Sequence, residues 1–580
     1  MLSTMRFKII AIILCFTLSV LGKSISEKQT DPDWWKHAVF YQIYPRSFKD
    51  SNNDGDGDLK GILQKLSHLK DAGVDALWMS PIMESPQVDQ GYDISDYYTI
   101  DSIFGNMDDL KNLIHEVHEL GLRVILDFVP NHTSDQHEWF KASENGTEEY
   151  KDYYVWVDGT PDKPPNNWLS NFRGSAWTWS EKRQQYYLHQ FMEQQPDLNY
   201  RHPKVHEEMK NILRYYMDLG IDGFRIDAML CAYEDEELRD EPRSYLPGVG
   251  PDESKYLLHI YTNHQPETYE LLYEWRQFVD EYAEKHNVET KVLMTEASGT
   301  FNQTIYYYGH PDGSTLGAHF CFNFFLIENF NLNISNAYDI MRIVYNWVDD
   351  LPKIFIPNWV IGNHDNRRAA TRYGPDDRDG WNMLAQLLPG IAVTYNGEEF
   401  GQEDGEVTYE QGQDPSARNR SIFEQVSRDF ERTPLQWDNT TNAGFNEGAK
   451  TWLPVSKKYH ELNLASQLDE NELSHYNIYK TLVQKRQESP ARIGTTDIWA
   501  LSEDSFVLKR SYENKHIVLA FKLGWHNHTE EESILIPGIS CENGTIALTN
   551  VGSNYTIGSS VNLQDLKLRP HESLVLDITC

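Results

Sequence analysis

The chain has 580 residues, 40% of them hydrophobic, and a formal net charge of −36. This length and apolar content predict packed cores in two or three domains and exclude a disordered chain. Because a strongly acidic surface repels phosphate backbones and anionic lipid, nucleic acid is not expected among the partners, whereas the oligomeric state stays open.

The N-terminus has the pattern of an export signal. Arg6 and Lys8 precede an apolar run over 9–21, and residues 20–22 offer a cleavage point. Thirteen helical residues rise about 20 Å, short of the roughly 30 Å hydrocarbon core of a bilayer, so an uncleaved anchor is disfavoured. We therefore expect a secreted, extracellular protein without a stable membrane span.

Three stretches share one pattern: apolar positions at helical spacing, then a glycine, then a short apolar run. The glycines and the runs that follow them are Gly73 with 74–79, Gly121 with 122–129 and Gly220 with 221–226. Glycine supplies the left-handed residue that ends a helix before the chain reverses. Repeated helix–strand units predict parallel strands joined by helices, hence an α/β sheet or barrel, with further strands at 292–295, 359–362 and 391–395.

The composition and the hydrophobic periodicity of the sequence change in two places. Residues 133–203, rich in Trp, Tyr, Asn and Pro, separate the third and fourth strands and indicate an inserted domain. Beyond about residue 490, helical periodicity gives way to short apolar runs that predict an antiparallel β domain. The predicted units are an export signal at 1–22, the first part of the barrel at 23–132, the insertion at 133–203, the second part of the barrel at 204–490 and the β domain at 491–580.

Four of the predicted strands end in acidic residues. The segments are 127–132 (DFVPNH), 223–228 (GFRIDA), 295–298 (TEAS) and 360–365 (VIGNHD). In a β/α barrel the groups at the carboxyl ends of the strands converge on one face, which makes these residues active-site candidates. A single strand-end acid is as readily a helix cap or a surface ion pair, but four in order are hard to explain that way.

These segments resemble, in the same order, the signature regions of the α-amylase clan of glycoside hydrolases. The segments 91–95 (GYDIS), 195–199 (QPDLN), 427–429 (SRD) and 432–437 (RTPLQW) resemble its α-glucosidase and oligo-1,6-glucosidase branch, most of all the insect secreted maltases. The resemblance runs from about Trp34 to the C-terminus. It implies a (β/α)8 TIM barrel with a subdomain inserted after strand 3 and a C-terminal antiparallel β domain. It also implies a retaining, exo-acting α-glucosidase that releases terminal glucose from short α-1,4-glucosides and sucrose.

The resemblance assigns catalytic roles by position in the motifs. It implies that Asp227 is the nucleophile, that Glu296 is the acid/base, and that Asp365 binds sugar hydroxyls in the transition state. Retaining cleavage needs the first two carboxyl groups about 5–5.5 Å apart. Arg225 lies two residues before Asp227, on the same strand face, and is expected to keep that carboxylate ionised.

The resemblance also assigns a pocket for the nonreducing glucose. It implies that Asp93, His132 and His364 hold this sugar and that Tyr92 stacks against it. Arg428 resembles a residue that pairs with a carboxylate of the same pocket. For each of these side chains, a purely structural contact is the alternative.

Linkage and reaction type leave further alternatives. Ala228 matches the form of the motif associated with α-1,4 bonds, which favours maltose and sucrose over isomaltose. A glucosyltransferase or sucrose isomerase would use the same site, and product analysis in concentrated sucrose separates these activities from hydrolysis. Some clan members are inactive receptors or transporter subunits, a reading disfavoured because all three carboxylates are present.

An acidic loop predicts a structural Ca²⁺ site. Oxygen-bearing side chains alternate along the loop, at Asp50, Asn52, Asp54, Asp56 and Asp58. The spacing copies the first part of an EF-hand loop, although Gly61 stands where that loop has its bidentate Glu. A solvated acidic turn is the alternative. Neither a catalytic metal nor an organic cofactor is expected.

Cysteines and sequons fit an exported glycoprotein. Cys541 and Cys580 could form a disulfide in the terminal domain, whereas Cys231 and Cys321 are as readily buried thiols as a bridge. Glycosylation is predicted at Asn145, Asn302, Asn333, Asn419, Asn439, Asn527, Asn543 and Asn554. Asn131 also fits the sequon but is expected inside the site and unmodified.

Overall fold

The computed structural model describes residues 31–328, 335–524 and 530–580. The predicted export signal and the sequons at Asn333 and Asn527 lie outside these residues. Within the described part of the chain, no helix is long and apolar enough to cross a membrane.

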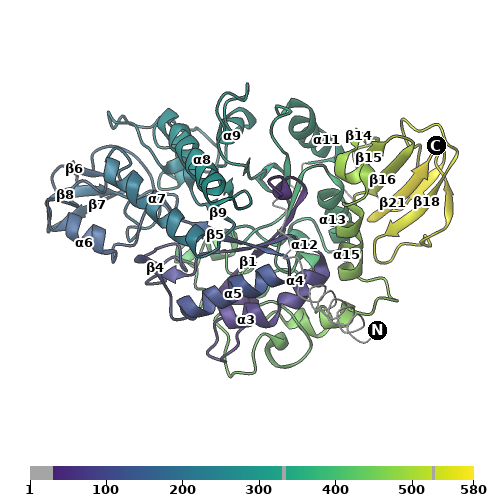
Figure 1. Cartoon of the computed structure of the whole chain (residues 1–580), viewed down its shortest axis with the longest axis horizontal. Helices are drawn as coiled ribbons and strands as arrows, with labels where there is room; N and C mark the ends of the chain where they lie inside the picture. Colours follow the sequence, from purple (N-terminus) through teal and green to yellow (C-terminus); the bar gives the residue numbers. More distant parts are fainter. Residues whose placement is uncertain (1–30, 329–334, 525–529) are drawn as a thin grey trace, which may run out of the picture.

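A curved sheet of eight parallel strands occupies the middle of the molecule (Figure 1). Its order is β11 (Phe320–Cys321), β10 (Val292–Thr295), β9 (Gly223–Ile226), β5 (Arg123–Phe128), β2 (Ala76–Met79), β1 (Val39–Ile43), β13 (Ile391–Tyr395) and β12 (Asn358–Val360). Almost every residue of these strands is buried, as expected when helices cover the outer face of a parallel sheet.

Two asparagines join the ends of this sheet. The Asn358 side chain donates to the carbonyl of Cys321 (2.6 Å), and the Asn323 side chain donates to the carbonyl of Asn358 (3.1 Å). The backbone N–H of Asn323 donates to the Asn358 side chain (2.9 Å). Side-chain bonds thus link β11 to β12 where both strands are short, and the predicted (β/α)8 barrel is confirmed.

The helices before the strands end as predicted. Gly73 follows α4 (Leu66–Ala72) with a φ of 79°, and its N–H bonds the last carbonyls of that helix. In the described part of the chain, the helices of eight or more residues are α5 (Met107–Glu119), α7 (Pro203–Asp218), α8 (Pro266–His286), α9 (Phe301–Tyr308), α11 (Ala337–Tyr345), α13 (Arg378–Leu387) and α15 (His475–Lys485). In α5 the buried side chains fall on one face, which packs on the barrel.

Two antiparallel sheets flank the barrel at opposite ends of the molecule (Figure 1). Between β5 and α7, the three-stranded sheet contains β6 (Trp156–Asp158), β8 (Gln185–Leu188) and β7 (Trp177–Ser180). The C-terminal six-stranded sheet contains β14 (Thr495–Ala500), β15 (Ser505–Tyr512), β16 (Lys515–Lys522), β21 (Glu572–Thr579), β18 (Asn543–Thr549) and β19 (Ser560–Asn562). It confirms the predicted C-terminal β domain.

The cysteine predictions can be compared directly with the structure. Cys541 and Cys580 form the predicted disulfide, with 5.7 Å between their Cα atoms. Cys231 and Cys321 are buried free thiols and do not form a disulfide bridge with each other.

Candidate active site

A cavity of about 360 Å³ opens at the carboxyl ends of the barrel strands. It lies at the small end of the roughly 300–1,000 Å³ usual for small-ligand sites. The predicted residues that line it are Tyr92, His132, Asp227, Ala228, Glu296, His364, Asp365 and Arg428. The inserted domain contributes Asn171, Phe172 and Phe191 to the wall, three residues that the sequence did not single out.

Arg225 binds three carboxylates beneath the cavity. One terminal nitrogen bonds Asp127 Oδ1 (3.0 Å) and Asp227 Oδ1 (2.5 Å), and the other bonds Glu296 Oε2 (2.5 Å). The strand order explains this contact, because β9 with Arg225 lies between β5 with Asp127 and β10, which leads into Glu296. Since one planar guanidinium binds both, the carboxyl groups of Asp227 and Glu296 are held within a few ångströms of each other.

Burial dominates the acid–base properties of this pair. It raises the pKa of Asp227 to about 7 and that of Glu296 to about 8, and Arg225 offsets only part of each rise. The expected contact of Arg225 with Asp227 is present, but its effect on the pKa is smaller than that of burial. Each carboxylate also raises the pKa of its neighbours, so the two groups titrate as one coupled pair and both pKa values lie above their ordinary range.

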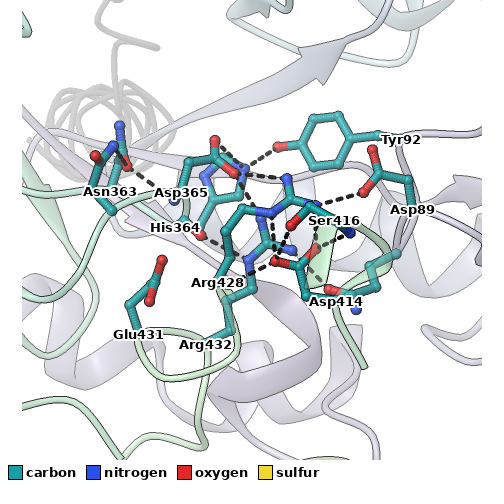
Figure 2. A network of polar contacts seen from close by, with 12 residues as sticks. Asp89, Tyr92, Asn363, His364, Asp365, Asp414, Ser416, Arg428, Glu431 and Arg432 are labelled. Atoms are coloured by element: carbon teal, nitrogen blue, oxygen red, sulfur yellow. Dashed lines mark hydrogen bonds and ion pairs between the residues drawn. The ribbon is translucent and has the colours of Figure 1, made fainter. Parts of the chain in front are cut away.

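Ion pairs surround Asp365 and Arg428, which line another part of the cavity (Figure 2). Asp365 Oδ1 bonds Arg432 (2.7 Å) and Arg428 (3.1 Å). Arg428 also reaches Asp89 Oδ1 (2.9 Å) and Asp414 Oδ1 (2.8 Å). Although burial alone raises the pKa of Asp365, His364, Arg432 and Arg428 together hold it well below its ordinary value. Asp365 is therefore a fixed negative charge.

The structure corrects one predicted substrate contact. Asp93 is fully buried and accepts bonds from Ser85 Oγ (3.0 Å) and from the backbone N–H groups of Val88 and Asp89 (both 2.9 Å). Its carboxylate therefore holds the loop together, and the cavity is lined instead by Asp89, four residues earlier. Asp89 lies just before the motif 91–95, and the loop conformation decides which of the two acids lines the cavity.

His364 lies between two aromatic rings at the end of the cavity that contains Asp365. Tyr92 stacks on it at 5.5 Å with a 5° interplanar angle, and Tyr44 stacks on the other side at 5.7 Å. The Gln42 amide bonds Nδ1 (2.7 Å), and Nε2 bonds the Tyr92 hydroxyl (2.7 Å) with Asp365 Oδ2 at 3.2 Å. Burial lowers the pKa of His364 well below 6.5, so the ring is neutral.

His132 and Ala228 complete the predicted set. His132 Nε2 lies 3.1 Å from the carbonyl of Tyr92, and burial lowers the pKa of its ring to about 4. Ala228 follows Asp227 in the left-handed region, with φ 47°. For a residue with a Cβ this conformation is strained, and such strain is often found at functional sites.

The acidic loop after α2 (Pro45–Phe48) is organised by its own hydrogen bonds. Asp50 Oδ1 accepts from the N–H groups of Asn52 (3.0 Å) and Asn53 (2.7 Å). Asp58 Oδ2 accepts from the N–H of Ser51 (2.8 Å), and Asp56 is paired with Arg46 (2.5 Å). Among the described residues, no three His, Cys, Asp or Glu side chains are grouped as metal ligands. Asp50, Asn52, Asp54 and Asp58 carry the oxygen donors that Ca²⁺ prefers, but each already accepts at least one backbone hydrogen bond within the loop. The carboxylate of Asp56 is paired with Arg46.

The fold and this site define a class of protein. A (β/α)8 barrel whose strand ends place two carboxyl groups on one arginine, with a third carboxylate across a small cavity, is a glycoside hydrolase.

The comparisons with known proteins give the family. Residues 42–493 match the family described as Alpha amylase, catalytic domain. The chain is 44% identical to Maltase 1 of Drosophila virilis, with 98% of this chain and 91% of that protein covered. It is also 44% identical to the salivary alpha-glucosidase of Anopheles gambiae, with 94% and 93% covered. Its structure is similar to that of the alpha-glucosyl transfer enzyme XgtA, with a TM-score of 0.81, 33% identity and 94% and 99% coverage. The chain belongs to the α-amylase family.

Proposed function

We propose that this protein is a retaining, exo-acting α-glucosidase that releases terminal glucose from short α-1,4-glucosides and sucrose. The insect relatives are named maltase and salivary alpha-glucosidase, and they align over almost the whole chain. The observation that carries the proposal is the pair Asp227 and Glu296, which bond opposite ends of one guanidinium at the floor of the cavity.

The reaction proceeds in two balanced steps. Asp227 attacks the anomeric carbon, the glycosidic C–O bond breaks, and Glu296 gives its proton to the leaving oxygen. Water then loses a proton to Glu296 and displaces Asp227 from the glucosyl ester, which restores both groups. Asp365 bonds hydroxyls of the sugar as the ring flattens toward an oxocarbenium ion, and this contact strengthens in the transition state.

The ion pairs of Arg428 support exo-action. Arg428 binds Asp89 and Asp414 at the end of the cavity that contains Asp365, and a cluster held in this way would leave a longer glucan no room beyond its terminal glucose. Because the pocket holds a nonreducing terminus, a single glucose leaves in each cycle.

The test is glucose release from maltose, sucrose and isomaltose by the purified protein. We expect activity on the first two, less on the third, and none measurable for Asp227→Asn. The matched control is Asp218→Asn, which makes the same change at an exposed carboxylate that ends α7. Full activity in Asp227→Asn, or loss in both variants, would contradict the assignment.

Transfer of glucose to a sugar hydroxyl is the second candidate activity, with sucrose isomerisation as its intramolecular form. It is supported by the structural similarity to an alpha-glucosyl transfer enzyme. Both activities use the same glucosyl ester and differ in whether water or a sugar accepts it. Products formed in concentrated sucrose decide between them: free glucose and fructose support hydrolysis, whereas new oligosaccharides or rearranged disaccharides support transfer.

We also propose secretion and a structural Ca²⁺ on the loop 50–58. Secretion is supported by the salivary relative, by the disulfide and by the exposure of the sequon asparagines Asn145, Asn302, Asn419, Asn439, Asn543 and Asn554. Asn131, by contrast, is buried beside His132. Recovery of the protein from the medium of expressing insect cells, with a mass that falls on endoglycosidase treatment, tests secretion and glycosylation together.

A further inference from the structure

A buried chain of polar contacts leads from β1 to the carboxylates beneath the cavity. It begins at Gln42, which is fully buried and whose amide nitrogen lies 2.7 Å from His364 Nδ1. His364 Nε2 lies 2.7 Å from the Tyr92 hydroxyl, and this hydroxyl lies 3.1 Å from Asp127 Oδ2 (Figure 2). The chain therefore passes through two side chains of the cavity wall and ends at Asp127.

Each of the two middle side chains has a single proton to donate. Burial lowers the pKa of His364 well below its ordinary value and raises that of Tyr92 well above its own, so both side chains are neutral. A neutral imidazole donates from one nitrogen and accepts at the other, and a neutral phenol donates to one partner. The chain therefore runs either from Gln42 toward Asp127 or from Tyr92 toward Gln42.

The two acidic neighbours of the chain favour the first direction. With the imidazole proton on Nε2, His364 accepts from Gln42 and donates to Tyr92, which leaves the Tyr92 O–H free to donate to Asp127. With the proton on Nδ1, Tyr92 must donate to Nε2, and its contact with Asp127 Oδ2 then contains no hydrogen. The bare Nε2 would also face Asp365 Oδ2 at 3.2 Å. Buried lone pairs that face each other are costly, so the geometry favours the proton on Nε2.

The last bond of the chain bears on the nucleophile. Asp127 Oδ1 binds Arg225 (3.0 Å), and the same guanidinium nitrogen binds Asp227 Oδ1 (2.5 Å). Burial raises the pKa of Asp127 to about 6, against the lowering effect of Arg225 and of the bond from Tyr92. The O–H of Tyr92 thus helps to keep Asp127 ionised, and an ionised Asp127 holds Arg225 by a charge-assisted bond.

We propose that Gln42 is a positioning residue for glycoside cleavage: its amide sets the tautomer of His364 and thereby turns the Tyr92 hydroxyl toward Asp127. This inference rests on the proposed glucosidase function. Gln42 lies outside the set of residues that line the cavity, so it acts without touching the sugar. Among the described residues its Oε1 has no hydrogen-bond partner, which costs stability. The bond to His364 is therefore what this buried amide contributes.

The kinetic test replaces the amide by an apolar side chain of similar length. In Gln42→Met the imidazole proton is no longer held on Nε2, so Tyr92 turns away from Asp127 part of the time and the pKa of Asp127 rises. Asp127 then takes up its proton at a higher pH. The acidic limb of kcat/KM for maltose should therefore move to higher pH by about half a unit to one unit. The alkaline limb, which Glu296 sets, should stay in place.

A matched control separates positioning from loss of stability. Gln386 is also buried and has an unpartnered Oε1, but its Nε2 bonds Thr394 (3.4 Å), which does not line the cavity. Gln386→Met should lower Tm by a similar amount and leave the pH profile unchanged. Because Tyr92→Phe removes the hydroxyl through which Gln42 acts, adding Gln42→Met to it should give no further shift. An unmoved acidic limb in Gln42→Met, an equal shift in Gln386→Met, or an undiminished shift in the Tyr92→Phe background would overturn the proposal.

A spectroscopic measurement separates this inference from the proposed function. In protein labelled with ¹⁵N at histidine, Nδ1 of His364 should resonate as an unprotonated nitrogen and Nε2 as a protonated one. Loss of these signals in His364→Gln assigns them, and Gln42→Met should mix the two tautomers. A proton on Nδ1 in the wild-type chain would overturn the role of Gln42 even if the enzyme cleaves maltose. If the proton is on Nε2 but the chain cleaves no α-glucoside, the proposed function fails while the direction of the hydrogen-bond chain is supported.

Discussion

The two ends of the active-site cavity are lined by different kinds of side chain. At the glucose end, Arg428 and Arg432 bind Asp89, Asp365 and Asp414 in a network that leaves little freedom (Figure 2). On the side of Glu296, by contrast, the cavity is lined by Ser298, Glu328 and Asn263, with no comparable network of arginines among the described residues.

This difference predicts unequal selectivity for the sugar and for the leaving group. Buried polar groups that lack their partner cost far more than a missing apolar contact, so a polar network rejects a wrong sugar strongly. A wall with few paired charges, such as the one around Ser298 and Asn263, discriminates less and accepts more shapes. The enzyme is therefore expected to be strict about glucose and permissive about what leaves, and each prediction below perturbs one side of that contrast.

The largest effect is expected at the junction of the two ends, from Glu296→Gln. Without a proton donor, kcat/KM for maltose should fall by about 10²- to 10⁴-fold. For p-nitrophenyl α-glucoside the fall in the glycosylation step should be much smaller, because a nitrophenolate leaves without a proton. Equal losses for both substrates would show that Glu296 is not the acid.

The pH profile follows from the same two carboxyl groups. Glu296, with a pKa raised to about 8, is protonated below that pH and loses its proton as the pH rises through it. Asp227, with a pKa of about 7, loses its charge as the pH falls. We expect a bell-shaped kcat/KM for maltose, whose alkaline limb disappears in Glu296→Gln assayed with p-nitrophenyl α-glucoside. An alkaline limb that persists in that variant would assign it to another group.

At the glucose end, Arg428→Lys should lower kcat/KM about 10- to 100-fold. Lysine keeps the charge but loses the planar fork that reaches three carboxylates at once. The loss should be the same for maltose and octyl α-glucoside, because both present the same glucose. The control is Arg367→Lys, at an ion pair with Asp404 outside the residues that line the cavity. A loss that depends on the aglycone would contradict the separation of the two ends.

The sequence predicted the catalytic residues better than it predicted the side chains around them. Asp227, Glu296 and Asp365 were predictable because strand ends converge in a barrel and because their motifs are specific. The choice between Asp89 and Asp93 was not predictable, because it depends on which carboxylate accepts the backbone hydrogen bonds of the loop.

Other features depend on distances that no local pattern encodes. The net pKa of Asp227 is a balance between burial and Arg225, and only the folded structure sets that balance. A second cavity, of about 720 Å³, combines Ile260, Phe301 and Phe325 from separate loops and helices, with no periodicity to link them. The barrel itself was predictable because its helix–glycine–strand units repeat.

A smaller effect is expected beside the nucleophile, from Ala228→Val. The added bulk should shift the ratio of isomaltose to maltose cleavage about tenfold toward isomaltose, as the family motif implies. Since residue 228 has φ 47°, a β-branched side chain should also cost about 1–2 kcal/mol of stability. Ala228→Gly, which relaxes the strain without adding bulk, should leave the linkage preference unchanged. A ratio that moves equally in both variants would point to backbone strain rather than side-chain bulk.

The smallest effect is expected when a chelator removes the proposed Ca²⁺. Only sugar binding at the glucose end of the cavity should change. The N–H of Trp452 donates to the carbonyl of Gly55 in the acidic loop (2.9 Å), and the Trp452 ring stacks on Tyr44 at 6.0 Å. Tyr44 in turn stacks on His364, so a loosened loop displaces the wall behind the sugar. A chelator should lower Tm by a few degrees and raise KM for maltose and octyl α-glucoside alike.

Two variants of the same loop sharpen the calcium prediction. Asp54→Asn should abolish the response to chelator, because it removes the charge of a carboxylate that accepts one backbone bond through Oδ1 and whose other oxygen would be available to the ion. Asp56→Asn should retain the response, because that carboxylate is already paired with Arg46. If Tm is unchanged by chelator and by added Ca²⁺, the loop is held by its own hydrogen bonds, and the stacked rings need no ion to support the glucose end.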